Sequence, residues 1–217
     1  MNKLFSYHFN SCLDVGANTG QFALELLANK DIKITSIEPN PHCIGRLKKL
    51  NVEYFNCGLG NKPGKLELLI PTDKSRSKAT SFFLPAGKTG IDDITKVEVD
   101  VYTGDELFKD KTFDLIKIDT QGYEYFVIDG AKELISRATY VLIEFQTVLT
   151  NEGAPESIDS VKLLESLGFR ICDLINVNNG TYVSKFNSTH LDILFEKRDT
   201  HNLECIKEFK DYFKELK

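Results

Sequence analysis

The chain alternates short apolar runs with segments whose apolar residues recur at helical spacing. An apolar run at 12–15 leads through a glycine-bearing turn into a helical segment at 23–28, and a second run at 32–37 ends at the acidic residue Glu38. Short runs bounded by turn residues are typical of strands buried on both faces of a sheet. Their alternation with helical segments predicts a doubly wound α/β fold with a largely parallel sheet.

The rest of the chain continues the same alternation. Five further strands are predicted, at 51–55, 113–119, 140–145, 169–175 and, antiparallel to its neighbours, 191–196. Helices are predicted after the second strand through Leu50, and at 105–108, 123–134 and 157–167. Together these segments predict a mostly parallel seven-stranded sheet with helices on both faces, in a single domain that spans residues 1–217.

Residues 64–101 interrupt this alternation, because they have strand rather than helix character. Strands are expected at 65–70, 79–84 and 96–101, which together predict a small antiparallel β insertion with two exposed loops. One of these loops carries three basic residues, Lys74, Arg76 and Lys78. This charge run is interpreted as a solvated surface. The alternative is a flap that contacts a negatively charged substrate.

The segment at 202–217 has apolar residues on one helical face and is predicted to be a helix. Packing on the domain is the expected role of this helix, and a homodimer contact is the alternative. Before the first strand there are only 11 residues, so we expect no helical lid at that end. A binding site at the carboxyl ends of the strands would then be either open on one side or closed by a later loop or a partner subunit.

Composition narrows the classes of protein. The chain has 217 residues, of which 41% are hydrophobic and 27% charged, as in a globular domain. The net charge of -5 argues against a general nucleic-acid binder. No apolar run approaches the roughly 20 residues of a membrane span. The five cysteines are widely spaced with no C-x-x-C pair, which predicts reduced thiols in the cytoplasm and no zinc ribbon.

The turn at 14–20 is the strongest candidate binding feature. Glycine permits close approach of the backbone to a ligand, and the helix that follows begins with free N–H groups. The dinucleotide fingerprint is not matched, because Asn18 stands at its second glycine position, and the P-loop is excluded because Gln21 follows Gly20. Glu38 is placed to accept hydrogen bonds from a ribose diol. An adenosine-bearing cofactor without phosphates therefore fits, and S-adenosyl-L-methionine (SAM) is such a cofactor.

Several motifs, in this order, resemble the FkbM family of SAM-dependent methyltransferases. They are Asp14–Gln21, Glu38–Pro41 and Asp114–Glu124, followed by shorter matches at 142–144, 167–169 and 191–195. The resemblance runs from about residue 12 to about residue 197. It implies a Rossmann-like class I methyltransferase fold with SAM as the cofactor.

The cofactor contacts expected from the turn geometry and the resemblance fall into three groups. Asp14 is expected to orient the glycine turn and accept from the SAM amino group, and the turn after the third strand is a candidate adenine contact or an ordinary glycine turn. Glu38 is expected to hold the ribose hydroxyls. The predicted cofactor-binding residues are Asp14, Gly16, Asn18, Gly20, Glu38, Pro39, Cys57, Gly58 and Asp119.

The predicted catalytic residues are Asp119, Glu144 and Lys117. Asp119 ends the fourth strand beside the expected position of the methyl group, as a general base or a metal ligand; a purely structural role is the alternative. Lys117 shares a strand face with Asp119 and is predicted to be neutralised by Asp119 or Glu144. Gln121 stands where the family commonly has glutamate. We therefore assign no metal ligand and leave metal dependence open.

The predicted function is O-methylation of a hydroxyl on a sugar, a glycan or another small metabolite by a cytoplasmic SAM-dependent methyltransferase. A non-catalytic SAM-binding or interaction protein and an NAD-dependent oxidoreductase are the alternatives. A nucleic-acid methyltransferase is disfavoured by the net charge and by the lack of an Asn/Asp-Pro-Pro-aromatic motif after the fourth strand.

Overall fold

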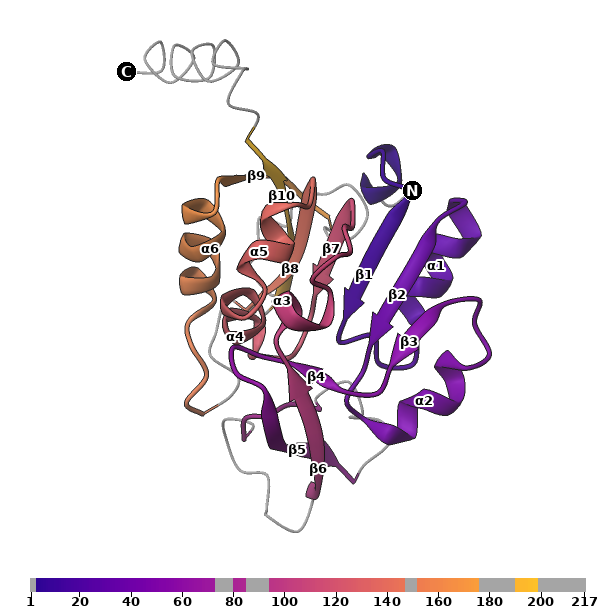
Figure 1. The fold of residues 1–217 in the computed structure, drawn as a ribbon, viewed down its shortest axis with the longest axis vertical. Helices are drawn as coiled ribbons and strands as arrows, with labels where there is room; N and C mark the ends of the chain where they lie inside the picture. Colours follow the sequence, from indigo (N-terminus) through magenta and orange to yellow (C-terminus); the bar gives the residue numbers. More distant parts are fainter. Residues whose placement is uncertain (1–2, 73–79, 85–93, 147–151, 176–189, 199–217) are drawn as a thin grey trace.

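The computed structural model describes residues 3–72, 80–84, 94–146, 152–175 and 190–198. Its main sheet has seven strands in the order β3-β2-β1-β7-β8-β10-β9 (Figure 1). The strands are β1 (Ser11–Val15), β2 (Lys33–Ile37), β3 (Glu53–Phe55), β7 (Leu115–Ile118), β8 (Tyr140–Gln146), β9 (Phe169–Leu174) and β10 (His190–Lys197). Pairings are parallel except those of β10, which is antiparallel to β8 and β9. The predicted sheet, including its antiparallel closing strand, is confirmed.

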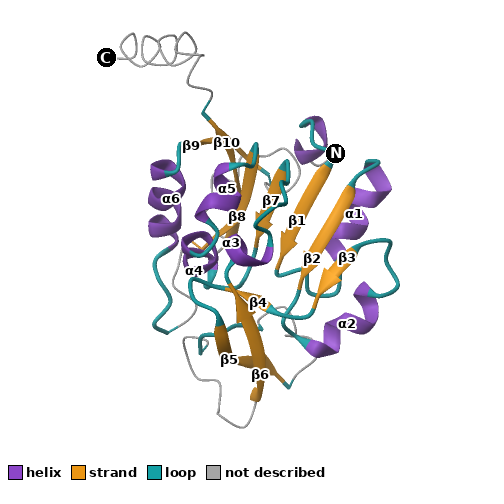
Figure 2. Cartoon of the chain, in the orientation of Figure 1, coloured by secondary structure: helices purple, strands orange, loops and turns teal. Residues whose placement is uncertain are grey.

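Helices cover both faces of this sheet (Figure 2). They are the 3-10 helix η1 (Lys3–Ser6) and the α-helices α1 (Gln21–Asn29), α2 (Pro41–Leu47), α3 (Gly104–Leu107), α4 (Glu124–Asp129), α5 (Lys132–Ser136) and α6 (Ser157–Ser166). One apolar core packs the sheet against α4, α5 and α6, and the other packs it against α1 and η1. The Rossmann-like α/β fold class is therefore confirmed.

Side chains alternate along the central strands, so successive residues face either the α4–α6 layer or the α1 layer of helices. On β1, Leu13 and Val15 belong to the core on the α4–α6 side, so Cys12 and Asp14 face α1. On β7, Ile116 and Ile118 belong to the same α4–α6 core, and Lys117 faces α1. Asp14 and Lys117 are paired residues in the parallel register of β1 and β7. The sheet therefore places these two charged residues side by side on the α1 face.

A smaller sheet lies beyond the carboxyl ends of the parallel strands (Figure 1). It has the order β4-β6-β5, with β4 (Gly58–Leu59), β5 (Gly64–Pro71) and β6 (Ile94–Tyr102). β5 and β6 are antiparallel, as predicted, but β4 joins β6 in parallel from the segment that was expected to be a turn. The third predicted strand, at 79–84, is reduced among the described residues to one bridge between Ser81 and Leu69. The basic residues 74, 76 and 78 and the tail at 202–217 lie outside the described residues.

The helix predicted at 123–134 is wrong as one element, because it divides into α4 and α5 at Gly130. A side chain at Gly130 would overlap the carbonyl oxygen of Gly60, so the chain after β4 runs directly against this break. The Gly130 carbonyl also accepts from the Asp105 N–H at 3.1 Å. Packing of the small sheet on this corner, rather than local propensity, ends α4.

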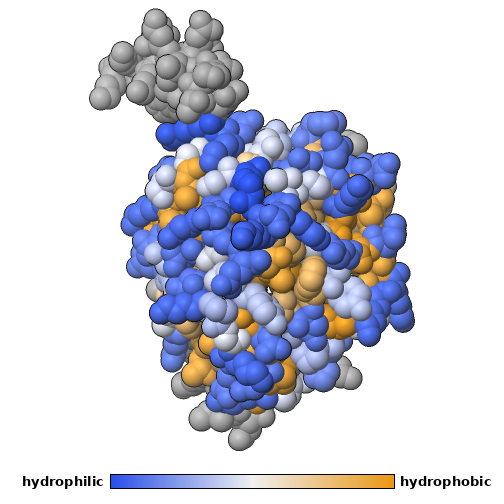
Figure 3. Space-filling view, viewed as in Figure 1, coloured by the Kyte–Doolittle hydropathy of each residue, from blue (hydrophilic) through white to orange (hydrophobic). Residues whose placement is uncertain are grey.

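The helices of the described residues can be compared with the requirements of a membrane span. None of the helices in the described ranges combines the length and the apolar character that a membrane span requires. On the face shown in Figure 3, hydrophilic side chains predominate and apolar side chains form scattered patches.

Candidate active site

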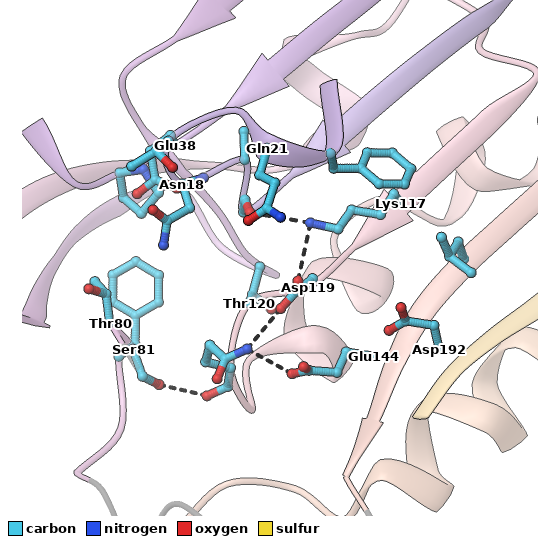
Figure 4. A pocket seen from close by; sticks show the side chains of 18 of the residues that line it. Asn18, Gln21, Glu38, Thr80, Ser81, Lys117, Asp119, Thr120, Glu144 and Asp192 are labelled. Carbon is cyan, nitrogen blue, oxygen red and sulfur yellow. Dashed lines mark hydrogen bonds and ion pairs between the residues drawn. The ribbon is translucent and has the colours of Figure 1, made fainter. Parts of the chain in front are cut away.

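A cavity of about 340 Å³ opens at the carboxyl ends of the parallel strands, on the α1 side of the sheet (Figure 4). Ligand pockets in proteins commonly occupy about 300–1,000 Å³, so its size suits a small organic molecule. The cavity is lined by the ends of β1, β2 and β7, by the start of α1 and by three side chains from β8 and β10, and the insertion lines the remaining side. Doubly wound sheets bind ligands at this edge.

The glycine turn brings the ends of β1 and β7 together. Gly16 has φ 80°, and a Cβ at this residue would overlap the carbonyl oxygen of Asp119. A residue with a side chain is thus excluded here both by space and by backbone conformation. Gly20 also has φ 81°, but a Cβ there would meet Leu50, which places it toward the α2 core and away from the cavity.

Glu38 is held by the backbone. Its carboxylate accepts from the Asn18 N–H at 2.6 Å and from the Asn40 N–H at 2.7 Å. Burial raises the pKa of Glu38 to about 7, and the two backbone donors oppose this rise. The side chain lines the cavity together with Pro39.

Lys117 on β7 connects β7 to the neighbouring strand β1 through ionic contacts. Its Nζ lies 3.1 Å from Asp14 Oδ1 and 3.3 Å from Asp119 Oδ2, and it donates to the Gly16 carbonyl at 3.3 Å. Burial opposes the charged ammonium, but the carboxylates of Asp119 and Asp14 raise the pKa of Lys117 above its ordinary value. The predicted pairing with Asp119 is confirmed. Asp14, fully buried, is a partner that sequence reasoning missed, and Glu144 forms none of the described ion pairs.

Three acidic residues, Asp119, Glu144 and Asp192, lie next to one another on the same face of the sheet and line the cavity. Ile118 pairs with Ile143 in register, so Asp119 and Glu144 come next to each other, and Glu144 pairs with Asp192 on β10. Burial raises the pKa of Glu144 to about 9, and the neighbouring carboxylates of Asp119, Glu124 and Asp192 add to the rise. Glu144 therefore carries a proton at neutral pH.

Gln121 connects two of these carboxyl groups. Its Nε2 donates to Asp119 Oδ1 at 2.9 Å and to Glu144 Oε2 at 2.8 Å. The loop that carries Gln121 is held by buried Glu124, whose carboxylate accepts from the N–H groups of Thr120 at 2.8 Å and Gly122 at 3.0 Å. Glu124 thus orders the loop. Asp119 has no structural role as the cap of the helix that follows, because Tyr123 is the N-cap residue of α4.

The insertion supplies a wall that the sequence did not predict. Thr80, Ser81 and Phe82 line the cavity, and the Ser81 hydroxyl donates to the Gln121 carbonyl at 2.8 Å. The centroids of the Phe82 and Tyr123 rings lie 4.8 Å apart. A Cβ at Gly58 would come within 2.9 Å of the Phe82 ring. Phe82 therefore covers Gly58 from the cavity side. Nothing local in the sequence marks these residues, because their position depends on the pairing of Ser81 with Leu69.

The structure brings most of the predicted site residues to one cavity. Those that line it are Gly16, Asn18, Glu38, Pro39, Lys117, Asp119 and Glu144. Four others, Asp14, Gly20, Cys57 and Gly58, are not among the residues that line it. Their roles in cofactor binding stay predictions, and the geometry favours indirect ones. The cavity residues that sequence reasoning missed include Thr80, Ser81, Phe82, Gln121 and Asp192.

Comparison with known proteins gives one family match. Residues 14–171 match the family model described as the methyltransferase FkbM domain. No curated protein matches the chain in sequence.

Several solved methyltransferases have a similar arrangement. A TehB-like SAM-dependent methyltransferase from Corynebacterium glutamicum is 14% identical, with 87% of this chain and 80% of that chain covered and a TM-score of 0.48. Precorrin-6y C5,15-methyltransferase from Geobacter metallireducens gives 14% identity, 87% and 81% coverage and a TM-score of 0.48. Aeropyrum pernix fibrillarin with natively bound SAM gives 13% identity, 86% and 66% coverage and a TM-score of 0.48.

Proposed function

The chain belongs to the FkbM methyltransferase family, and we propose that the group it methylates is a hydroxyl of a sugar, a glycan or another small metabolite. It is a SAM-dependent methyltransferase. The family match gives no support to an NAD-dependent oxidoreductase. The acceptor and the chemical roles of individual residues are the proposed part.

The residues of the cavity fit SAM. Glu38 presents a carboxylate at the end of β2, where a ribose diol is expected, and Gly16 lines the cavity beside Asp119. Asp14 and Asp119 surround Lys117, so this charged group carries one net negative charge when both carboxylates are ionised. A negative environment favours a sulfonium cation. When bound, SAM supplies a methyl group that its sulfonium has already activated.

The observation that carries the proposal is the position of Asp119. Its carboxylate lines the cavity, is paired with Lys117, and accepts from the Gln121 amide. An acceptor hydroxyl must lose its proton during transfer, and a carboxylate within hydrogen-bond reach can take it. Asp119 is therefore the proposed general base. Glu144, protonated at neutral pH, and Asp192 offer further polar contacts to a hydroxylated acceptor.

The first experiment separates binding from catalysis. Isothermal calorimetry with SAM and S-adenosylhomocysteine (SAH) measures binding. Reactions with methyl-labelled SAM are then run with a panel of sugars, oligosaccharides and hydroxylated metabolites. Mass spectrometry detects SAH and O-methyl products in these reactions. We expect binding of both cofactor forms and label on an acceptor oxygen. Label on nitrogen or sulfur contradicts the hydroxyl proposal. Binding without turnover on any acceptor supports the non-catalytic alternative.

A pair of variants then tests the role of Asp119. Asp119→Asn is expected to lower kcat by about 100-fold or more, because general bases contribute this much to proton transfer, while SAH affinity changes little. Asp31→Asn makes the same chemical change at an exposed position and serves as the matched control. Equal loss of SAH affinity and kcat in Asp119→Asn would assign Asp119 to cofactor binding instead.

A further inference from the structure

The side chain of Gln121 lies between two carboxyl groups and donates a hydrogen bond to each. Its Nε2 lies 2.9 Å from Asp119 Oδ1 and 2.8 Å from Glu144 Oε2, and an amide nitrogen carries two hydrogens, one for each carboxyl group. In Figure 4 the dashed lines from Asp119 and Glu144 meet at the side chain between them. The amide thus links the residue that follows β7 to a residue of β8.

The two linked carboxyl groups have unequal surroundings. Asp119 has the Lys117 ammonium at 3.3 Å, whereas no ion pair of Glu144 occurs within the described ranges. Glu144 faces three other carboxyl groups, namely Asp119 just after β7, Glu124 on α4 and Asp192 on β10. Burial among these carboxyl groups therefore favours the protonated form of Glu144.

The backbone of Gln121 indicates that its side chain matters. The residue has φ 54°, a left-handed conformation that glycine and asparagine adopt more readily than glutamine. The same loop already contains Gly122 with φ 98°. Asparagine would suit the backbone at position 121 better, but it is one methylene shorter. The length that reaches both carboxyl groups is the evident gain from glutamine.

We propose that Gln121 is a positioning residue, whose amide joins Asp119 and Glu144 into one unit that holds a single proton beside the acceptor. This inference rests on the proposed function for its meaning, because it concerns the state in which Asp119 meets an acceptor hydroxyl. The pairing itself is a property of the protein without cofactor or acceptor.

Carboxyl-carbon NMR tests the inference directly. Protein labelled with ¹³C at the side-chain carboxyl groups of Glu and Asp is titrated from pH 4 to pH 11.5, with Glu144→Gln and Asp119→Asn used to assign the two resonances. In the wild type we expect Glu144 to titrate near pH 9 and the Asp119 resonance to follow the same step. In Gln121→Asn we expect the Glu144 midpoint to rise by about one unit, because its ionised form loses a donor, and the Asp119 resonance to stop following it.

Two further variants separate the amide from the loop. Gln121→Gly keeps a residue suited to positive φ without any side chain and should reproduce the shift, which keeps the test valid if Gln121→Asn folds poorly. Ser81→Ala removes the hydrogen bond to the Gln121 carbonyl but leaves the amide, so its Glu144 titration should match the wild type. An unchanged midpoint in both Gln121 variants overturns the inference, as does an equal shift in Ser81→Ala. Failure of SAH binding would instead count against the proposed function.

Discussion

The two walls of the cavity hold their acidic groups by different means. On the β1–β2 wall, Glu38 is held by two backbone N–H groups, at 2.6 Å and 2.7 Å. On the β7–β8 wall, Asp119 and Glu144 are held by the side chains of Lys117 and Gln121. A backbone-held carboxylate needs only the right loop conformation, whereas a side-chain-held pair depends on which residues the neighbouring strands supply.

This difference matches the tasks proposed for the two walls. The adenosyl group of a cofactor is the same in every enzyme that uses it, so a fixed backbone arrangement can serve it. Acceptors and the protons they release vary, and side chains can be changed one at a time to suit them. We therefore expect substitutions on the β7–β8 wall to alter protonation and turnover, and substitutions in the β1 turn to alter folding and cofactor binding together.

The largest effect is expected for Lys117→Met. Removal of the ammonium leaves Asp14 and Asp119 without their shared cation, and loss of one partner of a buried pair costs about 3–5 kcal/mol. Urea unfolding measures the loss. It should be greater at pH 8 than at pH 5, because burial already raises the pKa of Asp14 and a protonated Asp14 no longer needs the cation. Lys62→Met, at an exposed lysine, should stay within about 0.5 kcal/mol of the wild type.

Gly16→Ala tests the other wall and should come next in size. The new methyl group would overlap the Asp119 carbonyl at a residue with φ 80°, and we expect about 3 kcal/mol of destabilisation with loss of SAH binding. Gly45→Ala is the matched control, since a Cβ at this exposed position of α2 meets nothing within 4 Å. It should stabilise the protein by about 0.5–1 kcal/mol through helix propensity. Similar stability of both variants would contradict the close approach of β1 and β7.

The pH dependence of SAH binding probes Glu38. Because burial raises its pKa to about 7, the carboxylate that accepts from a ribose diol is mostly present at pH 8 and mostly protonated at pH 6. The affinity for SAH should therefore fall about tenfold between pH 8 and pH 6, equivalent to about 1.4 kcal/mol. Calorimetry measures the change, and Glu38→Gln should bind more weakly with a flat profile over this range. An equal pH slope in wild type and variant would remove Glu38 from the ribose site.

Ser81→Ala is expected to have the smallest effect. The Ser81 hydroxyl donates to the Gln121 carbonyl at 2.8 Å and accepts from the Phe83 N–H at 3.1 Å, so its removal should cost about 1 kcal/mol in urea unfolding. The loss should be nearly the same at pH 5 and pH 8, in contrast to Lys117→Met. A strong pH dependence would mean that the insertion takes part in the titration of the acidic wall.

The comparison of the two walls also shows which features local sequence can predict and which depend on distant parts of the chain. The glycine turn, Glu38 and the Lys117–Asp119 pairing follow from residues close together along single strands and turns, where alternation and turn chemistry apply. The division of the 123–134 helix at Gly130 and the wall formed by Ser81 and Phe82 do not follow in this way. Both depend on a small sheet: the chain that follows its β4 strand runs against Gly130, and its β5 edge pairs with Ser81.

By itself the sequence determined the strands of the main sheet in chain order, their parallel arrangement with an antiparallel last strand, and the edge of the sheet where the candidate site lies, because apolar periodicity and glycine positions are local properties. Only the tertiary structure decided the partners within the site. Asp14 meets Lys117, and Gln121 spans Asp119 and Glu144, because the register between β1, β7 and β8 sets which side chains are neighbours. Register arises from packing of the whole sheet, so no single stretch of the chain contains it.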